Sequence, residues 1–125
     1  MKHKILIVED DCHMRRLLKY NLDKDFTVAT TNDGAAALAW LRAGNLPDLI
    51  VADVRMPNVH GFDFLKNIRV SSVFKNIPVI FLTAKAQSSD RIAGLKLGAD
   101  DYMTKPFNPE ELAVRIENIL HRNQV

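Results

Sequence analysis

The segment Lys4-Ile5-Leu6-Ile7-Val8-Glu9-Asp10-Asp11 (residues 4–11) decides the fold, because it joins an apolar run directly to a cluster of acids. Residues 5–8 are aliphatic and rich in isoleucine and valine, which favour a β-strand. Because no polar residue interrupts this run, the strand is expected to be covered on both faces, as in a parallel sheet between helices. The acids would then stand at the end of a buried strand.

Similar apolar runs alternate with segments of helical periodicity along the rest of the chain. Strands are predicted at 4–8, 26–30, 49–53, 78–83 and 102–104, and the third and fourth are the most continuously apolar and so the most central. Alternating strands and helices are typical of βαβ units. The sequence therefore predicts an α/β fold in which a five-stranded parallel sheet is doubly wound by five helices.

End signals and apolar spacing mark the predicted helices. Asn32 is expected to cap the second helix and Gly44 to end it, and Gly98 is expected to end the fourth. The fifth has Asn108 as its cap and Pro109 at its first position. The fourth has few apolar anchors, which predicts a weakly held helix. The residues expected to face the core are Met14, Leu17, Leu18, Leu22, Leu38, Leu41, Phe62, Leu65, Ile68, Ile92, Leu95, Leu97, Leu112, Ile116, Ile119 and Leu120.

Composition narrows the class of protein. A chain of 125 residues with 47% hydrophobic and 26% charged residues suits one globular domain, and its short apolar runs predict no membrane span. The net charge of +2 is not gathered in a basic run, so direct nucleic-acid binding is not expected. The single cysteine, Cys12, excludes an internal disulfide and fits the reducing cytoplasm.

Three kinds of polar group follow the predicted strands. Glu9 and Asp10 follow the first strand, Asp53 ends the third, Thr83 ends the fourth and Lys105 follows the fifth. Ligands of open α/β sheets bind beyond the carboxyl ends of the strands, so these side chains are expected to lie together. Acids, a hydroxyl and an amine would meet at one edge.

The chemistry of this set favours a magnesium-dependent phosphoryl acceptor. Glu9, Asp10 and Asp53 with Lys105 leave a formal charge of −2, which one Mg²⁺ would neutralise. Asp53 can serve as the nucleophile that forms an acyl phosphate, while Lys105 supplies a compact positive charge and Thr83 a hydroxyl donor. A glycine-rich phosphate loop, as in dinucleotide or P-loop sites, is not present after the first strand.

Several segments together resemble the receiver domains of response regulators, in order and over essentially the whole chain. They are Ile5-Leu6-Ile7-Val8-Glu9-Asp10-Asp11, Asp53-Val54-Arg55-Met56-Pro57, Gly61, Leu82-Thr83-Ala84, Gly98-Ala99-Asp100-Asp101-Tyr102 and Lys105-Pro106-Phe107. The resemblance implies a flavodoxin-like strand order, 2-1-3-4-5, and a phosphorylation-activated switch of a two-component system. A single receiver domain is expected over 1–125, with no effector domain in this chain, which would be either a stand-alone regulator or a receiver cut from a longer protein.

The resemblance also implies roles for individual residues. Asp53 would accept the phosphoryl group from a sensor histidine kinase or phosphotransfer protein. Asp10, Asp53 and the backbone carbonyl of Arg55 would ligate Mg²⁺, with Glu9 acting through water. The domain would not be an ordinary enzyme, but would promote its own phosphorylation and dephosphorylation.

Further roles concern the phosphoryl group and the switch. Thr83, Ala84 and Lys105 would bind the phosphoryl group, and the peptide bond from Lys105 to Pro106 would be cis. Thr83 and Tyr102 would form the switch pair, in which Thr83 moves toward the phosphoryl group and the ring of Tyr102 turns inward.

A resemblance to the subclass that carries a winged-helix DNA-binding domain suggests a homodimer and a role in transcription regulation. The dimer would form through the fourth helix, fifth strand and fifth helix, with ion pairs from Arg91, Asp100, Asp101, Glu111 and Arg115. The same charges could equally form a solvated surface.

Other interpretations remain open. A magnesium-dependent phosphohydrolase would usually need a second aspartate two residues after the nucleophile, where this chain has Arg55. A phosphorylation-independent interaction module would be expected to lack part of the acid, threonine and lysine set. Taken singly, Asp10 or Asp11 could cap the first helix and Tyr102 could be a core residue. Arg55 and Lys85 are expected to flank the phosphoryl group and slow its hydrolysis.

Overall fold

The computed structural model describes residues 2–85 and 87–122 and confirms the predicted α/β architecture. Its elements, in chain order, are β1 (Lys4–Val8), α1 (Cys12–Leu22), β2 (Thr27–Thr31), α2 (Gly34–Arg42), β3 (Leu49–Ala52), α3 (Gly61–Val70), β4 (Val79–Thr83), α4 (Ser88–Lys96), β5 (Asp101–Thr104) and α5 (Pro109–Arg122). The five strands pair in parallel in the expected order, β2-β1-β3-β4-β5. The single domain was predicted over 1–125, and of this range residues 1 and 123–125 lie outside the described ends of the chain.

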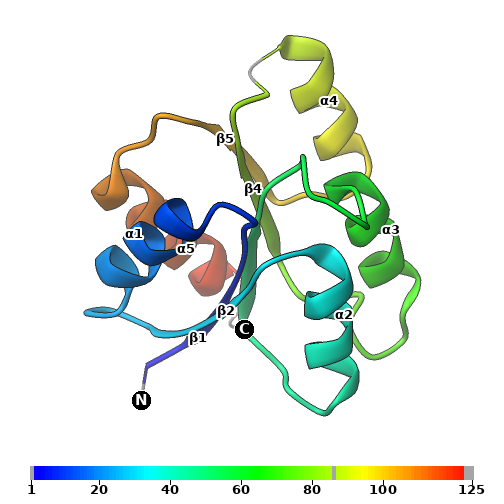
Figure 1. Cartoon of the computed structure of the whole chain (residues 1–125), viewed down its shortest axis with the longest axis horizontal. Helices are drawn as coiled ribbons and strands as arrows, with labels where there is room; N and C mark the ends of the chain where they lie inside the picture. The colour runs from blue at the N-terminus through cyan, green and yellow to red at the C-terminus, as the bar shows by residue number, and fades with distance from the viewer. Residues whose placement is uncertain (1, 86, 123–125) are drawn as a thin grey trace.

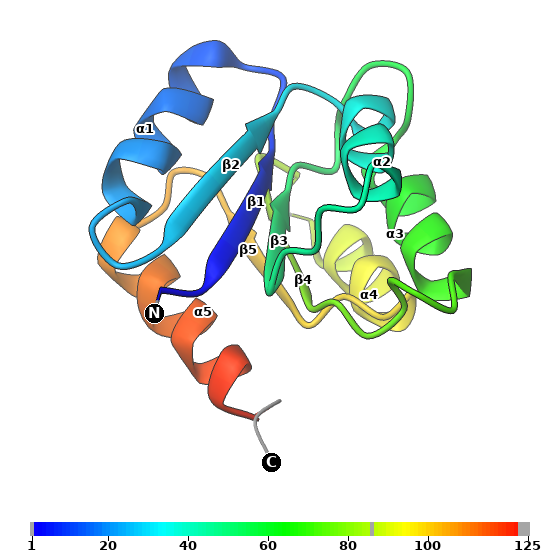
Figure 2. The same ribbon diagram turned by 90° about the horizontal axis from the view of Figure 1, so that it is seen from below.

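Helices cover both faces of the sheet, in two unequal layers. Figure 1 shows α1 and α5 on one face and α2, α3 and α4 on the other, and Figure 2 shows β2 at the edge of the sheet. Alternate side chains of β1 enter separate cores, because Ile5 and Ile7 pack on the α1/α5 side while Leu6 and Val8 pack on the other. Every residue of β3 and β4 is buried, which confirms these strands as central.

Two predicted details of the second βα unit are wrong by one residue. Strand β2 runs Thr27–Thr31, so Phe26 precedes it, although its side chain is buried. The N-cap of α2 is Asp33 and not Asn32, because a carboxylate oxygen of Asp33 accepts the N–H of Ala36 at 2.7 Å. Both residue types are favoured caps, so the sequence alone did not separate these neighbours.

The predicted core stripes are correct for α2 and α5 and partly wrong for α1, α3 and α4. Leu17, Ile92 and Leu95 are exposed by 47%, 50% and 44%. Of the two phenylalanines in α3, Phe62 was the one expected in the core. Phe62 is half-buried, whereas Phe64 is fully buried. Within α4 the buried residue is Gly94, which agrees with the expected weak anchoring of this helix.

Arg69, in the last turn of α3, holds three separate segments together. Its guanidinium donates to the carbonyl oxygens of Ile77 and Gly98, each at 2.7 Å, and to the Asp100 carboxylate at 3.1 Å. Arg69→Lys is expected to lower the unfolding free energy by about 2 kcal/mol, because a lysine cannot serve these acceptors at once. Urea unfolding of both proteins measures the difference.

Arg42→Lys is the matched control, because Arg42 is an exposed arginine in the last turn of α2. Its unfolding free energy should stay within about 0.5 kcal/mol of the parent value. Equal stability of the Arg69→Lys variant and the control would contradict the role assigned to Arg69.

Candidate functional site

The carboxyl edge of the sheet brings the predicted polar residues together. Glu9 directly follows β1 and Asp53 directly follows β3, and these strands pair with Val8 opposite Ala52. Thr83 is the last residue of β4 and pairs with Thr104, so Lys105 follows one position beyond. The register of the parallel strands therefore places all four side chains at one edge.

Three carboxylates converge at this edge in an arrangement that fits a divalent metal ion. Glu9, Asp10 and Asp53 each offer one oxygen, and the three oxygens lie within 4.8 Å of one another. Glu9 and Asp53 are buried, whereas Asp10 is exposed and can be reached from solvent. Hard oxygen ligands with one open side suit Mg²⁺, which keeps several of its waters.

Lys105 donates hydrogen bonds to two of these carboxylates. Its Nζ donates to Glu9 Oε1 at 2.7 Å and to Asp53 Oδ2 at 2.9 Å. Burial alone would lower the pKa of Lys105, but the bonds to both carboxylates outweigh it and raise that pKa above 10.5. The amine therefore stays charged, and the peptide bond between it and Pro106 is cis, as predicted.

Glu9 has a direct protein partner in Lys105, and its predicted contact with Mg²⁺ through water stays a prediction. Burial raises the pKa of Glu9 above 4.5, although the hydrogen bonds from Lys105 and from the Asp11 N–H oppose this shift. Arg15 reaches back from α1 and donates to the carbonyl oxygens of Glu9 at 2.9 Å and Asp10 at 3.3 Å. Sequence reasoning missed Arg15, because a basic residue on an amphipathic helix carries no distinguishing signal.

The loop after β3 and Lys105 hold Asp53 from two directions. The backbone N–H of Arg55 donates to Asp53 Oδ1 at 3.2 Å, while Lys105 binds the other oxygen. Gly61 closes the loop by donating its N–H to the carbonyl oxygen of Val54 at 2.7 Å. Both oxygens of the Asp53 carboxylate are therefore oriented by the chain.

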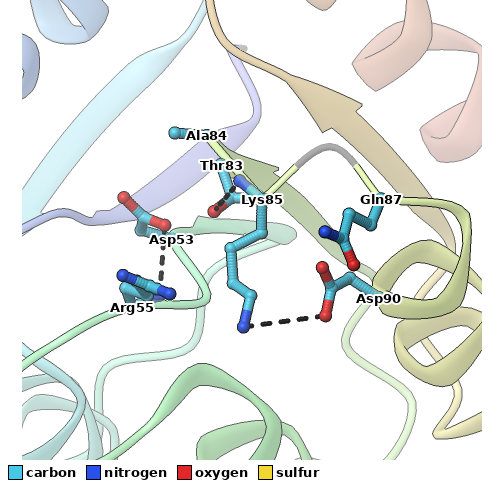
Figure 3. A pocket seen from close by; sticks show the side chains of 7 residues that line it. All are labelled: Asp53, Arg55, Thr83, Ala84, Lys85, Gln87 and Asp90. Carbon is cyan, nitrogen blue, oxygen red and sulfur yellow. Dashed lines mark hydrogen bonds and ion pairs between the residues drawn. The ribbon is translucent and has the colours of Figure 1, made fainter.

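An open pocket of about 490 Å³ lies against Asp53 and includes the predicted flanking residues. Figure 3 shows Arg55 beside Asp53, and the side chain of Lys85 extending across the pocket to Asp90 of α4. The Lys85 ammonium and the Asp90 carboxylate are 3.6 Å apart. Thr83 is buried and its hydroxyl oxygen accepts the N–H of Lys85 at 3.3 Å.

Comparisons with known proteins agree with this arrangement. Residues 5–117 match the family described as the response regulator receiver domain. The chain belongs to this family. The receiver is 42% identical over its whole length to 51% of the alkaline phosphatase synthesis transcriptional regulatory protein PhoP of Bacillus subtilis. It is 47% identical over 97% of its length to 50% of the transcriptional regulatory protein CpxR of Klebsiella pneumoniae. It therefore spans about half the length of these curated relatives.

Solved structures support the same assignment for the receiver. A response regulator from Chloroflexus aurantiacus superposes with a TM-score of 0.92 at 37% identity, covering 98% of this chain and 100% of that one. The chemotaxis response regulator CheY4 of Vibrio cholerae gives a TM-score of 0.87 at 33% identity, covering 95% and 99%. Within the described residues of the receiver, no helix is both long and apolar enough to cross a bilayer.

Tyr102 of the receiver is buried under α4. Its hydroxyl donates to the carbonyl oxygen of Lys85 at 2.8 Å, and its ring lies against Gly94. A Cβ at position 94 would come within 3.1 Å of the ring, so the glycine makes room for it. Lys85 thus contacts Thr83 through its N–H and Tyr102 through its carbonyl.

Four of the residues predicted for a dimer face of the receiver already make ion pairs within one chain: Asp100, Asp101, Glu111 and Arg115. Arg115 donates to Asp101 at 2.8 Å and lies 3.6 Å from Glu111. Asp100 accepts from Arg69 and from the N–H of Val79 at 2.9 Å. Pairing of these charges across a dimer therefore stays a prediction.

Replacing Glu9 by glutamine is expected to stabilise the metal-free receiver at pH 7 by about 1 kcal/mol, because a buried carboxylate no longer has to ionise and Lys105 keeps its bond to Asp53. The raised pKa of Glu9 means that stability falls as the pH rises from about 4.5 through its folded-state pKa, and glutamine removes this loss. Urea unfolding at pH 7 and at about pH 5 should show the advantage shrinking at the lower pH.

Glu117→Gln, on the exposed side of α5, is the control for the loss of one charge. It should change the unfolding free energy by no more than about 0.5 kcal/mol at either pH. A Glu9→Gln protein less stable than its parent at pH 7 would show that the Lys105 bonds outweigh burial.

Proposed function

We propose that this receiver takes a phosphoryl group on Asp53 and acts as the switch of a two-component system. One observation carries the proposal. The buried Asp53 carboxylate opens onto a pocket, with Lys105 Nζ at 2.9 Å and two further carboxylates within 4.8 Å. A nucleophile, a cation site and a fixed positive charge are the parts that phosphoryl transfer needs.

In the proposed site, Asp10, Asp53 and the backbone carbonyl of Arg55 would hold Mg²⁺, with Glu9 contributing through water. The three carboxylates and Lys105 leave a formal charge of −2, which matches one divalent ion. When bound, Mg²⁺ would supply positive charge for the oxygens of the transferred phosphoryl group.

In the transfer step, a carboxylate oxygen of Asp53 forms a new bond to phosphorus. The bond from phosphorus to the donor breaks, and its electron pair leaves with the donor, a phosphohistidine or a small acyl phosphate. Lys105 then stabilises the phosphoryl oxygens, and Thr83 and the N–H of Ala84 donate to them. Attack of water on the same phosphorus would return Asp53 and release phosphate.

The output of the proposed switch is a shift of population between two conformations. Lys85 joins Thr83 to Tyr102 through its backbone, so movement of Thr83 toward the phosphoryl group would change the contacts under α4. We propose that this change acts through α4, β5 and α5 on a homodimer or an effector. Like its named relatives, the whole protein would then regulate transcription.

The proposed donor is a sensor histidine kinase or a phosphotransfer protein. A cytoplasmic location is part of the proposal, and the exposed free thiol of Cys12 suits a reducing compartment. Arg55 and Lys85 border the pocket and would hinder the hydrolytic water, so replacing either by alanine should shorten the phosphorylated lifetime.

The experiment that tests the function is the intact mass of the protein after incubation with acetyl phosphate, with and without Mg²⁺. A gain of one phosphoryl group that requires Mg²⁺ and is removed by hydroxylamine, which cleaves acyl phosphates, would support the proposal. Rapid release of phosphate with no stable gain would favour a phosphohydrolase. No reaction in either condition would leave a phosphorylation-independent interaction module.

A further inference from the structure

The loop between β3 and α3 carries the proposed metal site on its backbone. It begins at Asp53 and contains Arg55, whose carbonyl oxygen is a proposed ligand. Its inner end is fixed where Gly61 donates to the Val54 carbonyl at 2.7 Å. The position of the Arg55 carbonyl therefore depends on how the outer part of the loop is held.

The outer part of this loop has a left-handed backbone at a residue with a side chain. Asn58 has a φ of 70°, a region that costs non-glycine residues about 1 kcal/mol or more. Such a conformation persists when surrounding contacts hold it, and asparagine tolerates it better than most residues.

The contact that holds Asn58 comes from a segment 25 residues earlier in the chain. Asn58 Nδ2 donates to Asp33 Oδ2 at 2.9 Å, while Asp33 Oδ1 accepts the N–H of Ala36 at 2.7 Å. Because one oxygen caps α2, the Asp33 carboxylate is fixed, and its second oxygen is a rigid acceptor for the loop. Figure 2 shows this loop passing beside the start of α2.

An apolar contact accompanies this hydrogen bond. The side chain of Val59 lies over Gly34, so close that a Cβ at position 34 would be 3.0 Å from the Val59 Cβ. The loop is thus seated on the first turn of α2 by one hydrogen bond and one van der Waals contact, on adjacent residues of both segments.

We propose that Asp33 and Asn58 are positioning residues for the metal and phosphoryl site. Neither belongs to the acid cluster, yet together they hold the loop that carries Arg55, whose carbonyl oxygen is a proposed ligand. This inference rests on the proposed function, because it assigns the pair a purpose in Mg²⁺ binding at that site.

The test compares Mg²⁺ dissociation constants, measured by calorimetry on the unphosphorylated protein. Asp33→Ser keeps a capping oxygen for α2 but loses the second acceptor, so the constant should rise about fivefold to tenfold. Asp33→Asn also removes the charge, but its amide can still pair with a turned Asn58 amide, so binding should return to near the parent value. The difference between the two variants isolates the hydrogen bond from the charge.

Asn58→Gly tests the other partner, because glycine accepts the left-handed backbone and lacks the amide. Its matched control is Asn45→Gly. Asn45 follows the other end of α2, and its side-chain amide donates a 2.9 Å hydrogen bond to the Trp40 carbonyl oxygen, which glycine removes. The control should lower stability without weakening Mg²⁺ binding. The Asp33→Ser/Asn58→Gly double variant should bind no more weakly than either single variant, because both remove one interaction.

Amide hydrogen exchange of the metal-free proteins provides a readout that needs no ion. The Gly61 N–H should exchange faster in Asp33→Ser and Asn58→Gly than in the parent or in Asn45→Gly. If the parent binds Mg²⁺ and both variants bind it equally well, the inference is wrong and the proposed function is unaffected. A parent that binds no Mg²⁺ would overturn the proposed function and the inference with it.

Discussion

Asp53→Asn is expected to lose all phosphorylation by acetyl phosphate in the presence of Mg²⁺. A neutral amide oxygen is a far weaker nucleophile than a carboxylate oxygen, and the substitution also removes one charge of the cation site. Intact mass measured at equal protein concentration should show no phosphoryl gain. This result corresponds to a phosphorylation rate at least about 100-fold below that of the parent.

The control for this substitution is Asp48→Asn. Asp48 precedes β3 at the opposite edge of the sheet, where its carboxylate accepts the N–H of Lys4 at 2.7 Å. This variant should be phosphorylated at the parent rate even if its stability is lower. A parent-like phosphoryl gain in Asp53→Asn would mean that another residue is the acceptor.

Gly61→Ala is expected to have the largest effect on stability, lowering the unfolding free energy by about 3 kcal/mol. The added Cβ would stand 2.6 Å from the carbonyl oxygen of Asp53 and 2.7 Å from the Cα of Val54. Both are backbone atoms, so relief requires the end of β3 and its loop to move. Urea unfolding should show the loss of stability, and Mg²⁺ binding should weaken with it.

Gly44→Ala separates this crowding from the general cost of replacing a glycine. Gly44 has a φ of 103° but open space around it, so alanine there is expected to cost about 1 kcal/mol through backbone strain alone. Equal losses in the two variants would contradict the proposed clash at Gly61.

The site was largely predictable because a simple rule brings distant residues together. Asp53 and Lys105 are 52 residues apart and Glu9 and Lys105 are 96 apart, yet all follow parallel strands and therefore share one edge. The continuous apolar runs of β3 and β4 likewise placed these strands at the centre. These predictions depended on the types of residue along the chain and not on the exact positions of side chains in the fold.

Features that depend on tertiary packing could not be predicted from local patterns. Helical spacing does not distinguish Phe62 from Phe64, because Phe62 is three residues before Leu65 and Phe64 is four before Ile68. Only packing decides which of the two is fully buried. Ile92 and Leu95 were expected in the core, but α4 instead approaches the sheet through Gly94, which seats the ring of Tyr102. A small residue under an aromatic ring gives no periodic signal.

Contacts between loops were equally hidden. The hydrogen bond from Asn58 to Asp33 joins two segments that are 25 residues apart, and no role was predicted for either residue, because both are common turn types. The Asp33 cap itself was assigned to its neighbour Asn32. Side-chain hydrogen bonds between surface loops depend on how close the loops lie in the folded protein, and residue spacing in the sequence does not predict this.

The hold on both oxygens of Asp53 has a consequence for how the reaction responds to temperature. Arg55 N–H and Lys105 Nζ bind the two oxygens, so the carboxylate has little freedom to turn about its last side-chain bond. As the proposed acceptor, Asp53 would therefore lose little rotational entropy on reaching the transition state. The contribution of Asp53 to the activation barrier of phosphorylation should be mainly enthalpic. Removing the hydrogen bond to one of its carboxylate oxygens should make the activation entropy of phosphorylation more negative.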